Sequence, residues 1–137
     1  MALQRGRAVG EPEAGAEMLC VASRLELQRW RYLLPFIRLS NRVSKQLDEA
    51  PGLLRWAVLA EPWSKRFYTF TAWRDRSSLA AFVSTEPHAE AVRMMRVWGS
   101  PQSAFSEWSS TELPGRLSEI KDRLRQPTFY YKGGGTR

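Results

Sequence analysis

The chain contains one histidine, and a single imidazole is the natural starting point for chemistry at neutral pH. Since the ordinary pKa of a histidine is roughly 6.5, His88 is suited to act as a general base, a hydrogen-bond partner or an axial haem ligand. Val92 and Met95 follow it at helical spacing, which places His88 on an apolar helix face. Three hypotheses stay open: His88 is the catalytic residue that contacts or deprotonates a substrate, it is a haem ligand, or it binds a backbone group and closes a cavity.

Large side chains on either side of His88 along the sequence could shape a pocket for a flat ligand. Tyr68 and Trp73 belong to an alternating aromatic stretch, and Phe82 lies in the segment that follows it. Six tryptophans in 137 residues could line a cavity for an aromatic or polyene molecule, although a large ring at the end of a strand is also typical of a core. The expected ligand-binding residues are Tyr68, Trp73, Phe82, Val92 and Met95.

Other kinds of site find little support in the sequence. One histidine and one cysteine, Cys20, cannot supply the ligands of an ordinary zinc site, and we expect no metal. Asp75 and Glu86 are typical of helix caps and turns, so no pair of catalytic carboxylates is indicated. The serines lack the spacing of a nucleophile elbow. His88 therefore remains the main candidate for catalysis.

The charge and hydropathy of the chain limit its partners. The formal net charge is +7, but the basic residues are mostly dispersed arginines, so we expect no nucleic-acid partner. No apolar run approaches the roughly 18 residues that span a bilayer, and residues 1–17 lack the apolar core of a signal peptide. We therefore expect no membrane partner and a cytoplasmic location.

The elements that must position His88 follow from periodicity and turn signals. Residues 1–17 are predicted to be a disordered tail, residues 18–126 one folded domain, and residues 127–137 a C-terminal tail that begins with a possible aromatic strand or latch. Strands are expected over 18–27, 53–60, 66–73 and 102–113. Helices are expected within 29–52, from about residue 75 to a break near Pro87, from His88 to residue 98, and over 114–124.

This order of elements predicts an α+β, ferredoxin-like βαββαβ fold, in which two helices cover one face of an antiparallel sheet and a short helix follows. The strands are apolar on both faces, and an apolar patch of that size is rarely left in water. We therefore expect a homodimer in which two sheets face each other as a dimeric α/β barrel, with one ligand cavity per chain.

The stretch from Met18 to about Thr111 resembles the antibiotic biosynthesis monooxygenase-like family of the dimeric α/β-barrel superfamily. The resemblance is carried by "APGLLRWAVLA" and by "FYTFTAWRDRSSLAAFVSTEPHAEAV", where a strand ending in Thr-x-Trp is followed by a charged turn, a helix with an aromatic residue and a histidine. With "RMMRVW" and "EWSSTELPGRLSEIKDRL" included, the chain is most similar to an uncharacterised, spheroidene monooxygenase-like branch.

The resemblance implies several chemistries, since the family includes cofactor-free quinone-forming oxygenases and haem degraders. Haem degraders, as the family implies, carry an asparagine on the first strand, a tryptophan in the second helix and a histidine about ten residues later. This chain has Ser23 and Arg24 on the first strand, Phe82 in the helix and Val92 ten positions further on. His88 lies about one helical turn too early for that histidine.

Three functional hypotheses follow, and the sequence leaves open whether the protein is an enzyme. The first is a monooxygenase-like protein that binds a small hydrophobic aromatic or isoprenoid-like ligand between sheet and helices and oxidises it without a tightly bound metal or other cofactor. The second is a non-catalytic ligand-binding or structural dimer of the same fold. The third is a haem-binding monooxygenase.

Overall fold

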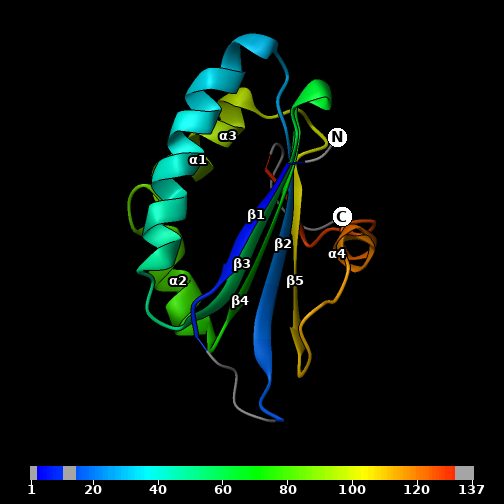
Figure 1. Cartoon of the computed structure of the whole chain (residues 1–137). Coiled ribbons are helices and arrows are strands. Elements are labelled where there is room, and N and C mark those ends of the chain that lie inside the picture. The colour runs from blue at the N-terminus through cyan, green and yellow to red at the C-terminus, as the bar shows by residue number, and fades with distance from the viewer. Residues whose placement is uncertain (1–2, 11–14, 132–137) are drawn as a thin grey trace.

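The computed structural model describes residues 3–10 and 15–131. In this part of the chain six antiparallel strands form one sheet in the order β1-β3-β4-β2-β5-β6 (Figure 1). The strands are β1 Leu3–Ala8, β2 Met18–Glu26, β3 Leu53–Glu61, β4 Arg66–Trp73, β5 Ala104–Ser110 and β6 Phe129–Tyr130. The helices are α1 Leu33–Asp48, α2 Arg76–Ser84, α3 His88–Trp98 and α4 Leu117–Arg123, with short 3-10 turns η1 Trp30–Tyr32 and η2 Pro62–Ser64.

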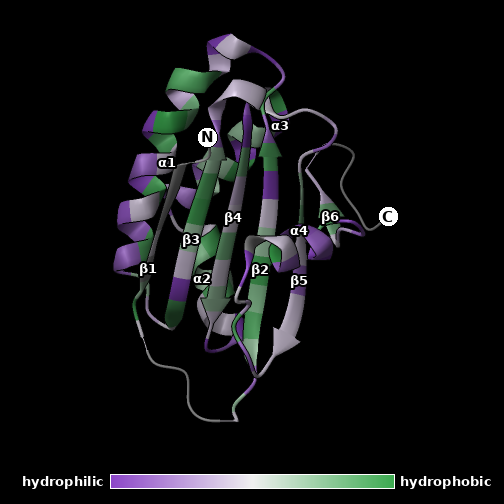
Figure 2. Cartoon of the chain, turned by 45° about the vertical axis from the view of Figure 1, so that its right-hand side comes forward, coloured by the Kyte–Doolittle hydropathy of each residue, from purple (hydrophilic) through white to green (hydrophobic). Residues whose placement is uncertain are grey.

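The four central strands and the first three helices form the predicted ferredoxin-like unit. The order β2, α1, β3, β4, α2–α3, β5 along the chain is a split β-α-β arrangement made twice. Helices α1, α2 and α3 lie on one face of the sheet (Figure 1), and α1 carries hydrophobic and hydrophilic residues on different sides (Figure 2). The expected α+β fold is confirmed.

Local sequence signals explain where the helices begin and end. Asp75 caps α2, accepting hydrogen bonds from the Ser78 N–H at 2.8 Å and the Ser77 hydroxyl at 3.0 Å. Gly52 adopts a φ of +82° in the turn after α1, and a Cβ there would collide with the Ser78 side chain. The same glycine and cap therefore bring the end of α1 and the start of α2 together. The predicted break near Pro87 is confirmed, because α3 begins at His88.

The expectation of a disordered tail over residues 1–17 is wrong for Leu3–Ala8. These residues form strand β1, which pairs with residues 55–60 of β3 and covers N–H and C=O groups that β3 would leave unpaired as an edge strand. Gly6 permits the close approach, since a Cβ there would lie 2.7 Å from the Trp56 carbonyl oxygen. Residues 1–2 and 11–14 of the expected tail lie outside the described residues.

The C-terminal segment adds a short strand at the edge of the sheet opposite β1. Phe129 and Tyr130 pair with β5 as β6, so the possible aromatic strand or latch expected after residue 126 is present. The rest of the expected C-terminal tail, residues 132–137, lies outside the described part.

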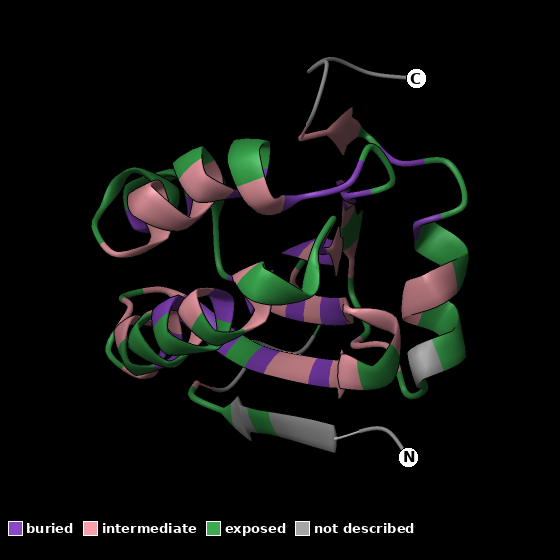
Figure 3. Ribbon diagram, turned by 90° about the horizontal axis from the view of Figure 1, so that it is seen from above, coloured by how far each residue is buried: buried purple, intermediate pink, exposed green. Residues whose placement is uncertain are grey.

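The second face of the sheet is not bare, contrary to the premise of the predicted dimer. Helix α4 lies across it (Figure 1), and Leu124 at 1% exposure packs against Ala22, Leu59 and Tyr68. Ile120 packs on the same side. Viewed from above, the sheet with its buried segments lies between the helices at left and a further helix at right (Figure 3). The chain therefore buries both faces of its sheet with its own helices.

Candidate functional site

A cavity of about 860 Å³ lies between the sheet and helices α1, α2 and α3. Two packed clusters bound it. One contains Trp56, Trp73 and Phe82, and the other contains Phe36 and Met95. The cavity therefore occupies the space between two aromatic ends of the core.

Small side chains in the middle of the sheet create this space. On the helix-facing side, Thr69 pairs with Ser23 of β2 and with Val58 of β3, and all three line the cavity. The residues two positions along β4 on either side of Thr69 are Phe67, which is buried, and Thr71. Because side chains on one face of a strand recur every second residue, a short row of small residues leaves a hollow there.

His88 lies on the cavity wall and is held by groups from two other helices. Its backbone N–H donates to the Gln46 Oε1 of α1 at 3.0 Å, and its ring Nδ1 lies 3.4 Å from the Val83 carbonyl oxygen of α2. The Gln46 amide also donates to the Phe82 and Thr85 carbonyl oxygens at 3.2 and 3.3 Å. One side chain of α1 thus fixes the corner between α2 and α3.

The surroundings of His88 favour its neutral form. Burial lowers the pKa of the imidazole, and the contact with the Val83 carbonyl raises it by a smaller amount. Since a carbonyl oxygen can only accept, the Nδ1 contact requires the proton on Nδ1 and leaves a lone pair on Nε2. The ring is therefore a neutral base at pH 7.

The aromatic residues expected at the site lie in different layers. Phe82 lines the cavity, with its ring 4.7 Å from that of His88. Trp73 is fully buried behind Phe82, with ring centroids 5.1 Å apart, and its Nε1–H donates to Thr71 Oγ1 at 2.8 Å. The expectation that Trp73 lines the ligand site is wrong: it supports the Phe82 ring from the core.

The apolar helix face predicted for α3 is present. Val92 and Met95 line the cavity one and two turns beyond His88, as their spacing indicates. Met95 is 3% exposed. The three residues therefore form one continuous wall.

Tyr68 was expected in the same pocket, and that expectation is wrong. It lies on the opposite face of β4, where it packs against Leu59 and Leu124, and the Lys121 Nζ lies 4.8 Å from its ring centroid. The reason is the two-residue period of a strand: Tyr68 and Trp73 are five positions apart, so they must point to opposite faces.

Several residues on the cavity wall were not singled out from the sequence. Ser23 and Thr69 contribute hydroxyls to its floor, and Tyr131 reaches it from the C-terminal segment. Arg76 and Glu107, which also line the cavity, form an ion pair of 3.2 Å between α2 and β5. The alternating pattern of β4 could have indicated Thr69, whereas no local pattern pointed to Tyr131, which lies 108 positions from its neighbour Ser23.

Within residues 3–10 and 15–131, no three His, Cys, Asp or Glu side chains gather as a metal site. The thiol of Cys20 is buried, and burial raises its pKa to about 11 despite the opposing charge of Arg123, so it is a poor nucleophile or ligand. In the same described part, no helix has the length and hydropathy needed to cross a membrane.

The chain is similar to known proteins in its fold and not in its sequence. No family model matches the sequence, and no curated protein matches it. Solved structures do match, and they include antibiotic biosynthesis monooxygenase-like proteins. The expected resemblance is therefore confirmed at the level of the fold.

Three of these structures illustrate the range of that fold. SnoaB, a cofactor-independent oxygenase from Streptomyces nogalater, is 13% identical, with 74% of this chain and 100% of that chain covered and a TM-score of 0.58. A protein described as an antibiotic biosynthesis monooxygenase is 14% identical over 70% of this chain and 99% of its own, with a TM-score of 0.57.

LmHde, a heme-degrading enzyme from Listeria monocytogenes, is 15% identical over 75% of this chain and 65% of its own, with a TM-score of 0.58. Identities of this size establish a shared fold and leave the activity to be argued from the site. The expected likeness to spheroidene monooxygenase-like proteins stays a prediction.

Proposed function

We propose that this protein is a small oxygenase-like protein that binds an aromatic or isoprenoid-like molecule in the cavity and oxidises it without a tightly bound metal. The observation that carries the proposal is the setting of His88: a neutral imidazole with its Nε2 lone pair available, on the wall of an apolar cavity of about 860 Å³. A cavity of that volume suits a drug-sized apolar ligand.

The chemistry we propose begins with removal of a proton. His88 Nε2 accepts the proton of an activated phenol, and the resulting anion transfers electrons to O₂ more readily than the neutral phenol does. In the overall reaction, a phenol with a ring hydrogen and O₂ give a quinone and water: one oxygen atom enters the ring, and the other leaves with two hydrogens of the substrate. Apolar walls favour the reaction because they exclude water from the anion.

The fold shared with SnoaB, described as a cofactor-independent oxygenase, supports this class of reaction. The site supports it separately, because the cavity wall places a base, His88, among apolar side chains. The two lines of support are independent, since one rests on backbone similarity and the other on the side chains of this chain.

The test replaces the imidazole and keeps a polar side chain of similar length. Oxygen uptake with hydroxyarenes of one, two and three rings is measured for the wild type and His88→Gln. We expect the variant to lose at least about 100-fold in turnover while it still binds the hydroxyarene, because general-base catalysis contributes on that scale. Glu49→Gln, at an exposed position after α1, is the control. Equal oxygen uptake by wild type and His88→Gln would contradict the catalytic role.

The alternative is a non-catalytic ligand-binding or structural protein, in which His88 only packs against Phe82. The same assay separates the two: tight hydroxyarene binding without oxygen uptake supports the alternative. Binding is followed by quenching of tryptophan fluorescence, since the chain has six tryptophans.

Haem binding is the third proposal, and it is favoured by the fold shared with LmHde. The described residues fit a haem only in part. His88 could be an axial ligand, but of the cations on the wall Arg76 is held by Glu107, and Arg96 is exposed. A haem titration followed by absorbance tests it: a Soret band that is lost in His88→Ala supports haem binding, and a flat titration excludes it.

A further inference from the structure

The C-terminal segment forms one wall of the cavity. Backbone hydrogen bonds run from the Thr128 N–H to the Phe105 carbonyl at 2.9 Å and from the Tyr131 N–H to the Ser103 carbonyl at 3.1 Å. The Glu107 N–H donates to the Thr128 hydroxyl at 3.1 Å. These bonds fasten the segment to β5, and its two rings at positions 129 and 131 both line the cavity.

Two aromatic rings fix the orientation of Tyr131. Phe105 and Phe129 stack with centroids 5.2 Å apart. The Tyr131 ring meets both edge-on, at 5.7 Å from Phe105 and 6.3 Å from Phe129. Edge-to-face contacts at these distances are favourable and directional, so the tyrosine has a defined position on the wall.

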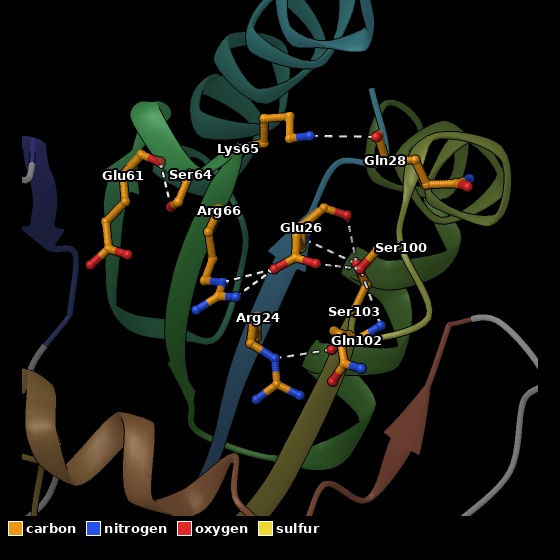
Figure 4. A network of polar contacts seen from close by, with 10 residues as sticks. All are labelled: Arg24, Glu26, Gln28, Glu61, Ser64, Lys65, Arg66, Ser100, Gln102 and Ser103. Carbon is orange, nitrogen blue, oxygen red and sulfur yellow. Dashed lines mark hydrogen bonds and ion pairs between the residues drawn. The ribbon is translucent and has the colours of Figure 1, made fainter. Parts of the chain in front are cut away.

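Ser103, whose carbonyl accepts the hydrogen bond from the Tyr131 N–H, belongs to a polar network at the end of β2 (Figure 4). The Ser103 hydroxyl donates to the Glu26 carbonyl and accepts from the Glu26 N–H, both at 3.0 Å. The Glu26 carboxylate accepts from Ser100 at 2.9 Å and from two nitrogens of Arg66. Burial acts to raise the pKa of Glu26, but these hydrogen bonds and the nearby positive charges lower it overall.

The side chains of Tyr131 and Ser23 both line the cavity. Burial raises the pKa of Tyr131, and the nearby Ser23 hydroxyl opposes this only in part, so the phenol keeps its proton. Ser23 is 7% exposed and pairs with Thr69 on the neighbouring strand. When Ser23 donates to the tyrosine oxygen, the tyrosine proton is available to a ligand.

This group of hydroxyls lies at the opposite end of the cavity from His88. Tyr131 packs in the cluster that contains Met95, whereas His88 contacts Phe82 of the other cluster. Along α3, His88 and Met95 are seven residues apart, which corresponds to about 10 Å of helix. The space between the two ends is lined mainly by apolar side chains, among them Val92 and Val58.

We propose that Tyr131 and Ser23 form a second polar subsite of the cavity. The ligand is then an elongated apolar molecule with an oxygen-bearing group at each end, one facing His88 and the other, a carbonyl or hydroxyl oxygen, accepting from Tyr131. This inference rests on the proposed function for the ligand cavity, and it names the shape and the polar groups of the ligand.

The test compares two probes that differ by one hydroxyl. The first is an anthraquinone with one hydroxyl at each end, and the second is an anthraquinone with a hydroxyl at one end only. We expect the wild type to bind the two-ended probe about fivefold to tenfold more tightly, the effect of one buried hydrogen bond. Tyr131→Phe should remove this preference while affinity for the one-ended probe stays unchanged, because the ring and its packing are retained.

Tyr130→Phe is the matched control, since it makes the same chemical change at the next residue, which does not line the cavity; the preference should persist there. A Tyr131→Phe variant that keeps the preference, or that weakens both probes equally, would overturn the second subsite. Equal binding of both probes by the wild type would also overturn it, and the proposed ligand cavity would stand. If the wild type binds neither probe nor any hydroxyarene, the proposed function fails as well.

Discussion

At the scale of single residues, the environment of His88 matters more than its type. An exposed histidine would be partly protonated near neutrality, whereas burial against Phe82 holds the pKa of His88 below its ordinary value of 6.5. The base is therefore ready to accept a proton at pH 7 and at somewhat more acidic pH. The contact with Val83 decides which nitrogen accepts it.

This shift predicts a pH-dependent stability. Above pH 6.5 the imidazole is neutral in both the folded and the unfolded chain, so it adds no pH dependence. As the pH falls below 6.5, the unfolded chain takes up the proton first, and the free energy of unfolding decreases until the folded-state pKa is reached. Denaturant titrations of the wild type between pH 7.5 and pH 5 should show this loss.

The control for this prediction is His88→Gln, which has no titrating ring. Carboxylates contribute equally to both proteins, so the difference between their unfolding free energies isolates the histidine. Parallel stability curves over the whole range would show that His88 is not buried as described.

At the scale of elements, α4 determines what the second face of the sheet can do. Leu124 at its end contacts Tyr68 of β4 and Leu59 of β3, and the Arg24 guanidinium donates to the Leu124 carbonyl at 3.3 Å. The Ser106 hydroxyl of β5 donates to the Arg123 carbonyl at 2.7 Å. Polar and apolar contacts together hold the helix against four strands, β2 to β5.

Truncating Leu124 should therefore be costly. Leu124→Ala is expected to lower the free energy of unfolding by about 2–4 kcal/mol, since a buried leucine leaves a cavity when it is shortened. Equilibrium unfolding in urea measures the change. Leu34→Ala on α1, whose side chain is 56% exposed, is the matched control and should change stability by less than about 0.5 kcal/mol. Similar losses for both variants would argue against the docking of α4.

At the scale of the whole molecule, the predicted homodimer loses its original physical argument. That argument required a bare apolar face, and α4 with Leu113 covers the residues in question. A face-to-face dimer of two such sheets would have to displace α4. The homodimer stays a prediction, and any interface that forms with α4 in place must use another surface.

Sedimentation of the wild type at micromolar concentration tests the dimer. We expect a homodimer, and a monomer under these conditions would show that prediction to be wrong. Leu124→Ala serves as the comparison, because loosening α4 should strengthen association if the second face is the interface and should leave it unchanged if the interface lies elsewhere.

Much of the architecture could be predicted from the sequence. Alternating and helical periodicities, the cap at Asp75 and the turn at Gly52 are local signals, and each acts within a few residues. They place β2 to β5 and α1 to α4 close to where the structure has them. The same periodicity places His88, Val92 and Met95 on one helix face.

Only the tertiary structure decided which of these residues form a site. The two-residue period of β4 shows that Tyr68 and Trp73 point to opposite faces of the sheet. Which of the two faces borders the cavity depends on where α1, α2 and α3 pack. Ser23 and Tyr131 meet because the chain returns to β5 after α4, and the pairing of β1 with β3 likewise joins distant segments. Local sequence patterns do not predict these contacts, because the residues that make them are far apart in the chain.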